Sequence, residues 1–509
     1  MDKQYASSCR KTGKKVSVRS NESHVIAAWL LVVLSPIFAI FFSYMFSSWS
    51  WGLMDDMAIL NSGNNFAERG YSYFVSLSRW GVFRPTFVLH SAFFYTVFES
   101  CPKGFYIFKL AEICLLLFIW GHVAFQLTKK RLSYVLVGAI TLSFHYFYDT
   151  FFYLSSHEFL GLIFLGICLV FLIEDINMDL DSKNILKDRK IGTLNVFSFF
   201  FGMVFLLCSF GAKETFVSCG IAVGISYLYL AFKAREKGCL KGFLIKGMFV
   251  IAITVSYALG LKYFIKSAYT SDFSFTNFVR IENNLIAWFK KDFLNHLPWV
   301  VWTAIFIFFE GKKECGIRKY FLNFSFNQKY GIFLGCVLYA GFLLMLLPWN
   351  TVSYYAAPMG LFFAFIVTLL ICDFNTRLNI KLQFLIIILA VFLNQFVCQY
   401  ALQRESSYQN DTMNLMIYIK NNPIFKNNIE DYRIFSNAME PASAIPSVMN
   451  KLWDLNISHF HWSMKTNDYE KENMRYYLYS SRFPRADISV FKNWSVIFYS
   501  NNWVVYRRP

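Results

Sequence analysis

Charged residues are scarce in this sequence of 509 residues: they make up 16% of it, against about a quarter of a typical soluble chain. Hydrophobic residues make up 56%, and phenylalanine alone occupies 59 positions. Long apolar stretches recur between residues 25 and 399, and they are continuous rather than alternating. These features exclude a soluble enzyme with a single anchor and a transmembrane β-barrel, and they predict a polytopic α-helical membrane protein.

Several motifs of soluble chemistry are also missing. The sequence has no Walker loop, no Rossmann glycine fingerprint, no His-Glu-x-x-His and no Gly-x-Ser-x-Gly, so it offers no visible nucleotide-sugar site on the cytoplasmic side. The eleven cysteines are scattered without a Cys-x-x-Cys pair, which argues against a zinc site or a disulfide framework. The formal charge of +17 comes from basic residues in short loops and from no basic-aromatic module, so no nucleic-acid partner is expected.

The apolar stretches differ in whether they are long enough to cross a membrane. A bilayer core about 30 Å thick requires roughly 20 apolar residues in a helix. We expect eleven membrane-spanning helices, near residues 25–49, 104–127, 132–147, 158–173, 192–210, 216–232, 247–265, 296–309, 331–348, 357–372 and 382–399. Residues 85–98 are apolar but too short for a span, so we interpret them as an interfacial or re-entrant helix beside the membrane.

Lysine and arginine are distributed unevenly among the loops. If the N-terminus is cytoplasmic, the cytoplasmic segments hold 25 of these residues, whereas the external loops without the C-terminal tail hold nine. The positive-inside rule therefore favours a basic cytoplasmic N-terminus over residues 1–24, before a retained signal-anchor. A transmembrane domain follows over 25–399, with a long external loop over 50–103, and an odd number of crossings places residues 400–509 outside.

The tail after residue 400 differs in composition from the rest of the chain. It is polar, it has short strand-like runs at 432–435 and 496–499, and residues 409–421 have the pattern of a helix with one apolar face. We expect a small external α/β domain.

The first external loop begins with two adjacent carboxylates, Asp55 and Asp56, behind the interfacial residues Trp49 and Trp51. Ionisable groups this close to the membrane tend to face a water-filled cavity. A carboxylate there could serve as general base for a sugar hydroxyl or could hold a divalent metal. The alternative is that one of the aspartates caps the helix that begins near Met57. Spacing alone favours the cap slightly.

Three cations follow in the external loops. Arg79 and Arg84 precede the short apolar helix, and Lys213 lies in a turn too short to leave the membrane interface. Cations at that depth suit a phosphate, which arginine binds through charge-assisted hydrogen bonds. Contacts with lipid headgroups, or a local ion pair between Lys213 and Glu214, account for them equally well.

Other polar residues of the external loops are candidates for binding a substrate. The second external loop contains His145, Asp149, His157 and Glu158. Their spacings match no helical metal motif, so polar lining of a substrate cleft is favoured over a metal site.

The fifth external loop offers uncharged groups, Trp349, Asn350 and Tyr354 among them, which suit a carbohydrate. An aromatic belt at the interface needs the same residues and is the simpler reading of each one. Inside the second span, Lys109 and Glu112 are three residues apart and could pair on one helix face.

This layout resembles the membrane-embedded GT-C glycosyltransferases in its many helices, the acidic residues and surface helix of its first external loop, and its external C-terminal domain. The pattern of Asp55-Asp56, then Arg79 to Pro85, then Lys213-Glu214 is most similar to the phage-encoded serotype-converting glucosyltransferases of enteric bacteria. The resemblance implies a multi-pass protein of the bacterial inner membrane with a periplasmic C-terminal domain. The acidic motif is shorter than in some related systems, which leaves a divalent metal cofactor (Mg or Mn) open.

For function, the resemblance implies a hexosyltransferase that moves a sugar, glucose in that subgroup, from a polyprenyl-phosphate donor to a lipid-linked periplasmic glycan such as O-antigen. Asp55 or Asp56 would be the base, and Arg79, Arg84 and Lys213 would neutralise the departing lipid phosphate. The residues expected to bind the substrate are Glu214, Asp149, His157, Glu158, Trp349, Asn350 and Tyr354. Because the donor's lipid stays in the bilayer, base and cations must meet at the membrane surface.

Two other classes of protein remain open. A transporter or flippase for lipid-linked sugars should carry its key charges in the middle of spans and show repeat symmetry. An O-antigen polymerase would join glycan repeats without consuming a monosaccharide donor. The candidate charges gather at one external face of this chain, which favours the transferase.

Overall fold

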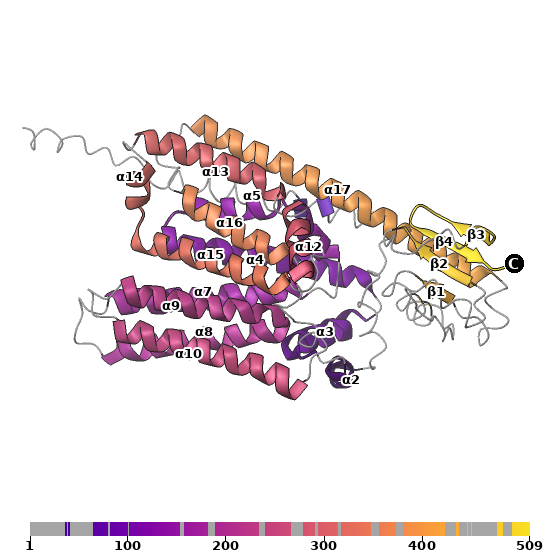
Figure 1. The fold of residues 1–509 in the computed structure, drawn as a ribbon, viewed down its shortest axis with the longest axis horizontal. Helices are drawn as coiled ribbons and strands as arrows, with labels where there is room; N and C mark the ends of the chain where they lie inside the picture. Colours follow the sequence, from indigo (N-terminus) through magenta and orange to yellow (C-terminus); the bar gives the residue numbers. More distant parts are fainter. Residues whose placement is uncertain are drawn as a thin grey trace, which may run out of the picture.

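The computed structural model describes residues 65–79, 82–99, 101–152, 157–181, 189–233, 240–265, 278–290, 294–313, 317–347, 356–372, 380–422, 434–436, 476–481 and 491–509, with the short pieces 36–37, 39–40, 445 and 449. The described residues form a bundle of helices with a small sheet beyond one end (Figure 1). The predicted fold class, a polytopic helical membrane protein with a small C-terminal α/β unit, is confirmed.

The helices follow one another with short connections. They are α2 (Phe66–Arg79), α3 (Pro85–Phe98), α4 (Pro102–Thr128), α5 (Leu132–Thr141), α6 (His145–Phe152), α7 (Glu158–Asp181), α8 (Arg189–Ala212), η4 (Glu214–Phe216), α9 (Val217–Lys233), α10 (Leu240–Gly260), η6 (Leu261–Ile265), α12 (Phe278–Trp288), α13 (Leu294–Lys313), α14 (Ile317–Leu322), α15 (Phe326–Leu346), α16 (Ala357–Ile371) and α17 (Ile380–Asn421).

Among the described residues, five helical segments are long and apolar enough to cross a membrane: α4, α7, η4 with α9, α10 with the start of η6, and α15. Shorter apolar segments lie in α3, α8, α13 and α16. Each predicted span from 104–127 onward coincides with a described helix or helix pair. The first predicted span, near 25–49, lies almost entirely outside the described residues.

One predicted span is wrong in shape. Residues 132–147 do not form a single straight helix, because α5 and α6 meet at an angle of 75°. Ser143 lies at the break, where its hydroxyl donates to the carbonyl of Ile140 at 2.6 Å and accepts from Nε1 of Trp299 at 2.8 Å. A serine hydroxyl that bonds the preceding turn competes with helical hydrogen bonding, so the chain changes direction there.

Contacts among residues at or near helix ends mark one end of the bundle. Arg84, before α3, pairs with Glu214, between α8 and α9, and Lys109 near the start of α4 bonds the carbonyl of Thr150 in α6. Arg84 directly precedes α3, and α3 lies at the end of the bundle where α17 leads into the C-terminal sheet, which we call the sheet end (Figure 1). Helix α14 lies at the opposite end, which we call the far end.

Helix α3 has the bounds predicted from the sequence and stays at the sheet end. With 14 residues it is roughly 21 Å long, and it is followed at once by α4, whose Glu112 bonds His90 of α3. α3 therefore runs antiparallel to the first part of α4, with His90 beside a residue about three turns into that helix. Its placement at or in the membrane stays a prediction.

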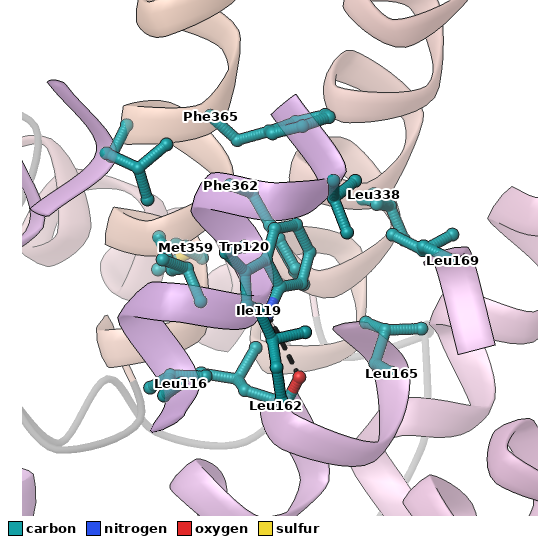
Figure 2. Packing of buried hydrophobic residues seen from close by; sticks show 14 of the residues in the cluster. Leu116, Ile119, Trp120, Leu162, Leu165, Leu169, Leu338, Met359, Phe362 and Phe365 are labelled. Carbon is teal, nitrogen blue, oxygen red and sulfur yellow. Dashed lines mark hydrogen bonds between the residues drawn. The ribbon is translucent and has the colours of Figure 1, made fainter. Parts of the chain in front are cut away.

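The core is built around Trp120 of α4 (Figure 2). The buried indole lies 5.5 Å from the rings of Phe362 and Phe365 in α16, and its Nε1 donates to the carbonyl of Leu162 in α7 at 3.0 Å. Gly166 of α7 lies against the indole, where an added Cβ would meet Nε1 at 3.0 Å, so this glycine permits the close approach of α4 and α7. Packing around Trp120 therefore fixes the positions of α4, α7 and α16 relative to one another. The polar residues at the ends of α4 and α7 are positioned in this way.

A cluster of charges joins three helices toward the far end. Lys246 of α10 bonds both carboxylate oxygens of Asp175 in α7, at 2.7 and 2.8 Å, and Asp179 at 2.8 Å. The hydroxyl of Tyr227 in α9 donates to Asp175 at 3.1 Å. We call these four residues the far-end cluster.

Helix α17 runs without a break from the bundle into the C-terminal unit (Figure 1). The span predicted at 382–399 and the helix predicted at 409–421 are therefore one helix, and the domain boundary predicted at residue 400 falls inside it. The sheet order is β1-β2-β4-β3, with β1 parallel to β2 and the other pairs antiparallel. The strands are β1 (Ile434–Ser436), β2 (Tyr476–Ser480), β3 (Ser495–Tyr499) and β4 (Trp503–Arg507), and the strand-like runs predicted at 432–435 and 496–499 overlap β1 and β3.

The sheet is tied to α17 by side-chain hydrogen bonds. Trp503 is fully buried, and its Nε1 donates to the hydroxyl of Thr412 at 2.8 Å. The side-chain amide of Asn502 donates to Asp411 at 2.7 Å. Because α17 also packs in the bundle, it holds the C-terminal sheet at the sheet end.

Candidate functional site

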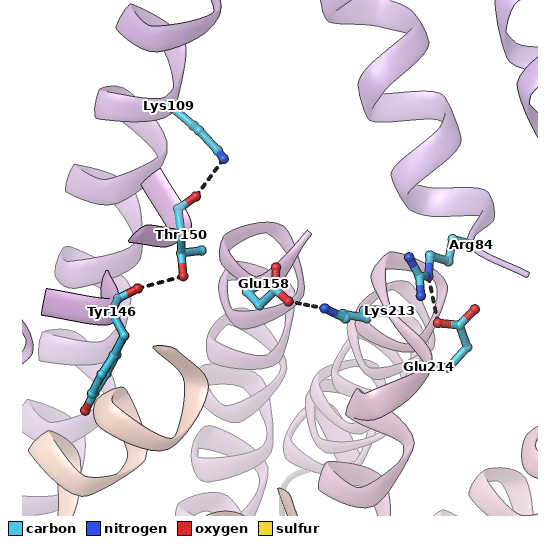
Figure 3. A network of polar contacts seen from close by, with 7 residues as sticks. All are labelled: Arg84, Lys109, Tyr146, Thr150, Glu158, Lys213 and Glu214. Carbon is cyan, nitrogen blue, oxygen red and sulfur yellow. Dashed lines mark hydrogen bonds and ion pairs between the residues drawn. The ribbon is translucent and has the colours of Figure 1, made fainter. Parts of the chain in front are cut away.

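Two ion pairs lie at the sheet end (Figure 3). Nε of Arg84 bonds Oε2 of Glu214 at 2.7 Å, and the two side chains are 13% and 19% exposed. Lys213 pairs with Oε1 of Glu158, and these side chains are 5% and 0% exposed. The sequence neighbours Lys213 and Glu214 thus each bind a residue far away in the chain. Together the pairs fasten the residue before α3 and the first residue of α7 to the two residues that follow α8, Lys213 and Glu214.

The local backbone explains why these side chains remain at the end of the bundle. Pro85 begins α3, where its fixed φ suits the first helical turn and its missing N–H is not needed. Arg84 therefore directly precedes the helix. Lys213 is the one extended residue between α8 and η4, with φ −159° and ψ 136°. The backbone N–H of Phe83 also donates to Glu214 at 3.2 Å, which holds this carboxylate against the start of α3.

Burial sets the charge of two groups that lie between spans. It lowers the pKa of Lys213 to about 8; Glu158 opposes this change and Arg84 adds to it. Burial also holds the pKa of His157 well below its usual range, and the nearby cations Arg84 and Lys213 act in the same direction. At neutral pH the site therefore presents two cations beside an uncharged imidazole.

Two buried atoms of this site have no hydrogen-bond partner among the described residues. They are Oε2 of Glu158 and Nδ1 of His157. A buried polar atom without a partner costs about 1–3 kcal/mol, and in native proteins nearly all such atoms are satisfied. The atoms therefore mark a place where a ligand, water or a segment outside the described ranges completes the site.

More polar contacts extend from the ion pairs toward α6. Nζ of Lys109 donates to the carbonyl of Thr150 at 2.9 Å, and the hydroxyl of Thr150 donates to the carbonyl of Tyr146 at 2.9 Å (Figure 3). Asp149, the residue before Thr150, pairs with Arg404 of α17. In the described part of the chain no three His, Cys, Asp or Glu side chains come together as metal ligands. This finding includes His145, Asp149, His157 and Glu158.

A pocket lies between α3 and α4, beside the ion pairs. Its free volume is about 20 Å³, which is room for roughly one water molecule. Its lining consists of Phe87, His90, Ser91, Phe94, Tyr95, Phe105, Phe108, Lys109, Glu112, His157 and Leu160. Nε2 of His90 and Oε1 of Glu112 are 2.7 Å apart across the pocket wall. His157 belongs to the lining and directly precedes Glu158, so the pocket adjoins the Lys213–Glu158 pair.

The structure brings together residues from three of the predicted external loops. Arg84, His157, Glu158, Lys213 and Glu214 form one group. Asp149 lies farther along, in its pair with Arg404. Arg79 is the last residue of α2. The remaining predicted residues, Asp55, Asp56, Trp349, Asn350 and Tyr354, lie outside the described residues, so their roles stay predictions.

Some residues of the site were not predicted from the sequence. His90 was not recognised, and Lys109 and Glu112 were expected only to pair with each other. Glu112 in fact bonds His90 from α3, and Lys109 bonds Thr150 from α6. The sequence could have indicated all three, because ionisable residues inside an apolar stretch tend to be functional.

The chain was compared with family models, with curated proteins and with solved structures. No family model matches the chain, and no curated protein matches its sequence. Among solved structures, the chain is similar to the crystal structure of ArnT from Cupriavidus metallidurans bound to undecaprenyl phosphate. The TM-score is 0.48 with 10% sequence identity, over 96% of this chain and 98% of that chain.

Proposed function

We propose that this chain is a GT-C-like membrane glycosyltransferase that transfers a hexose from a polyprenyl-phosphate carrier to a lipid-linked glycan. The observation that carries the proposal is the convergence of Arg84 and Lys213 from separate segments at one end of an apolar bundle. Each cation is held in place by a carboxylate. Pre-oriented cations in a water-poor site stabilise the charge that develops on a departing phosphate.

The surface of α3 supports a lipid-linked donor. This helix is apolar on nearly all sides, yet Leu89, Phe93 and Val97, four residues apart, are each about half exposed. An exposed stripe of large apolar side chains is typical of a surface that contacts lipid. A carrier whose tail lies along this stripe would have its phosphate near Arg84, which directly precedes the helix.

The proposed reaction is a single displacement at the sugar. The acceptor hydroxyl oxygen forms a bond to the anomeric carbon, and the bond from that carbon to the phosphate oxygen breaks. The electron pair of the broken bond stays on the lipid phosphate, whose added charge Arg84 and Lys213 stabilise. The hydroxyl proton goes to a carboxylate of the first external loop, Asp55 or Asp56, which act as general base in this proposal.

The finer assignment follows the sequence resemblance. We assign glucose as the sugar, O-antigen as the acceptor and the periplasmic face of the inner membrane as the place of reaction, with a cytoplasmic N-terminus. The uneven distribution of lysine and arginine supports this orientation. A divalent metal at Asp55 and Asp56 remains open, and no step above depends on it.

The test is transfer of radiolabelled glucose from polyprenyl-phosphate glucose in membranes that contain the full chain. We expect one hexose added per glycan repeat by mass, and no transfer by the double variant Asp55→Asn, Asp56→Asn at equal expression. Full activity of the double variant would contradict the assignment of the base. Translocation of the donor across vesicles without incorporation would instead identify a flippase, and longer glycans without added hexose would identify a polymerase.

A further inference from the structure

The two ion pairs of the site differ in what each cation needs from its carboxylate (Figure 3). An arginine keeps its positive charge whether or not a carboxylate is near, whereas a buried lysine loses its proton readily. The side chain of Arg84 is 13% exposed, while that of Lys213 is 5% exposed and is paired with a fully buried carboxylate, Glu158. Of these two cations, only the lysine therefore depends on its partner for its charge.

We propose that Glu158 is a positioning residue that acts through Lys213: it holds the ammonium group at the site and keeps it positively charged for the lipid phosphate. This inference rests on the proposed function. It gives Glu158 a different part from the contact with substrate that the sequence suggested.

The place of Glu158 in the fold suits this part. It is the first residue of α7, where the positive end of the helix dipole stabilises a carboxylate. Gly166 of α7 lies close against Trp120 of α4, so Glu158 belongs to a firmly packed helix. Lys213, by contrast, is the extended residue between α8 and η4. The packed helix therefore supplies the fixed group, and the lysine is held by it.

The charged and titratable groups around Lys213 come from several segments. Burial lowers the pKa of Lys213 to about 8, and Glu158 at the start of α7 is the strongest opposing influence. Arg84, before α3, lowers this pKa further, and Glu214 in η4 raises it. The neighbouring His157 is uncharged at neutral pH, because burial holds its pKa well below its usual range. Without Glu158, burial and Arg84 would be less opposed, so Lys213 would lose its proton at a lower pH.

The carboxylate of Glu158 acts on one cation in the described part of the chain. One of its oxygens bonds Lys213, and the other, Oε2, has no hydrogen-bond partner there. Glu214 accepts instead from Arg84 and from the backbone N–H of Phe83. The two carboxylates thus form a matched comparison, because Glu158 affects the charge and the placement of its cation, whereas Glu214 affects the placement alone.

The test compares Glu158→Gln with Glu214→Gln in the full-length protein. Transfer of glucose from polyprenyl-phosphate glucose and binding of this lipid are both measured from acidic to alkaline pH. The lipid is a phosphodiester, so it lacks the second ionisation that a phosphate monoester has at about pH 6. In Glu158→Gln, the pH above which transfer and binding fall should move down by about one to three units. In Glu214→Gln both should weaken, but this pH should move much less.

Two further variants separate the charge of Lys213 from the stability of the fold. Lys213→Arg in the Glu158→Gln background carries a cation that needs no carboxylate, so the fall at alkaline pH should disappear. Glu158→Asp keeps the carboxylate but withdraws it by one methylene group, so it should move the fall in the same direction by less. This conservative variant carries the test if Glu158→Gln does not fold.

The outcomes distinguish the role of Glu158 from the proposed function. If wild type transfers glucose while Glu158→Gln and Glu158→Asp keep the wild-type pH profile, whether or not their rates fall, this role is overturned and the proposed function stands. If wild type transfers no sugar but the pH dependence of lipid binding moves in Glu158→Gln, the proposed function is overturned and the role of Glu158 stands. If wild type neither binds the lipid nor transfers sugar, both are overturned.

Discussion

In the described part of the bundle, the far-end cluster and the ion pairs of the sheet end differ in how completely their buried atoms are paired. In the far-end cluster, both oxygens of Asp175 are bonded, to Lys246 and to Tyr227. At the sheet end, Glu158 uses one oxygen for Lys213, and its other oxygen has no partner among the described residues.

This difference separates a structural role from a functional one. A fully satisfied polar network in a low-dielectric interior makes the packing rigid and specific, and the far-end cluster joins α7, α9 and α10 in this way. An incompletely satisfied network is costly unless something else completes it. We therefore expect changes in the far-end cluster to lower stability and changes at the sheet end to lower transfer.

The largest expected effect is on stability, from Lys246→Met. Removing the ammonium group leaves Asp175 buried without its cation, and breaking a buried pair in this way costs about 3–5 kcal/mol. The measurement is thermal or denaturant unfolding of the purified protein, together with transfer per folded molecule, which should stay at the wild-type level. The double variant Lys246→Met, Asp175→Asn should recover part of the loss. Wild-type stability with abolished transfer would give the far-end cluster a functional role, as a transporter would require.

The next largest effect is on activity, from Arg84→Gln. Loss of one pre-oriented group that stabilises developing charge typically lowers the rate about a hundred- to a thousandfold. Stability should fall less than in Lys246→Met, because the carboxylate that loses its cation, Glu214, is 19% exposed, whereas that of Asp175 is fully buried. A matched control is Arg131→Gln, which removes an exposed arginine from the connection between α4 and α5. Equal loss of transfer in both variants would mean that the rate depends on the net charge of the protein and not on the position of Arg84.

The pH dependence of transfer gives a smaller effect that again concerns the sheet end. Lys213 loses its positive charge as the pH rises through its lowered pKa of about 8. If the cation is needed for the departing phosphate, the rate should fall about tenfold for each pH unit above that value. In Lys213→Arg the side chain stays charged, so this fall should move to higher pH. Identical pH profiles for the two proteins would remove Lys213 from the proposed reaction.

Much of the helical framework could be predicted from the sequence because it depends on local length and hydropathy. The bounds of α3 and the positions of α4 and α7 follow from runs of apolar residues. The bend at Ser143 was not predicted: its hydroxyl bonds the preceding turn and also a side chain, Trp299, from a distant helix, and the second contact is not visible in the local sequence. The continuity of α17 was also missed, because its polar middle part resembles a loop when only membrane burial is considered.

The sequence identified several residues of the site, but it did not show which of them pair with one another. Short polar segments between apolar runs identified Arg84, Glu158 and Lys213, because charged residues gather where helices leave the membrane. Which carboxylate binds which cation depends on the rotation and packing of several helices, and this information is not local. The sequence neighbours Lys213 and Glu214 therefore look like a pair, whereas each is bonded to another loop.

The smallest expected effect comes from a variant of the far-end cluster that removes a hydrogen bond but no charge. Tyr227→Phe deletes only the hydrogen bond from the phenol to Asp175. A hydrogen bond to a charged group is worth about 1.5–3 kcal/mol, and because Lys246 still bonds both oxygens of Asp175, we expect a loss at the low end of this range, with transfer unchanged. Unfolding and transfer are measured as for Lys246→Met. A loss as large as in Lys246→Met would mean that the phenol, rather than the ammonium group, holds the far-end cluster together. A loss of stability that is smaller in Tyr227→Phe than in Lys246→Met would show that each bond of the far-end cluster contributes separately to stability. This is expected for a group of residues that binds no ligand.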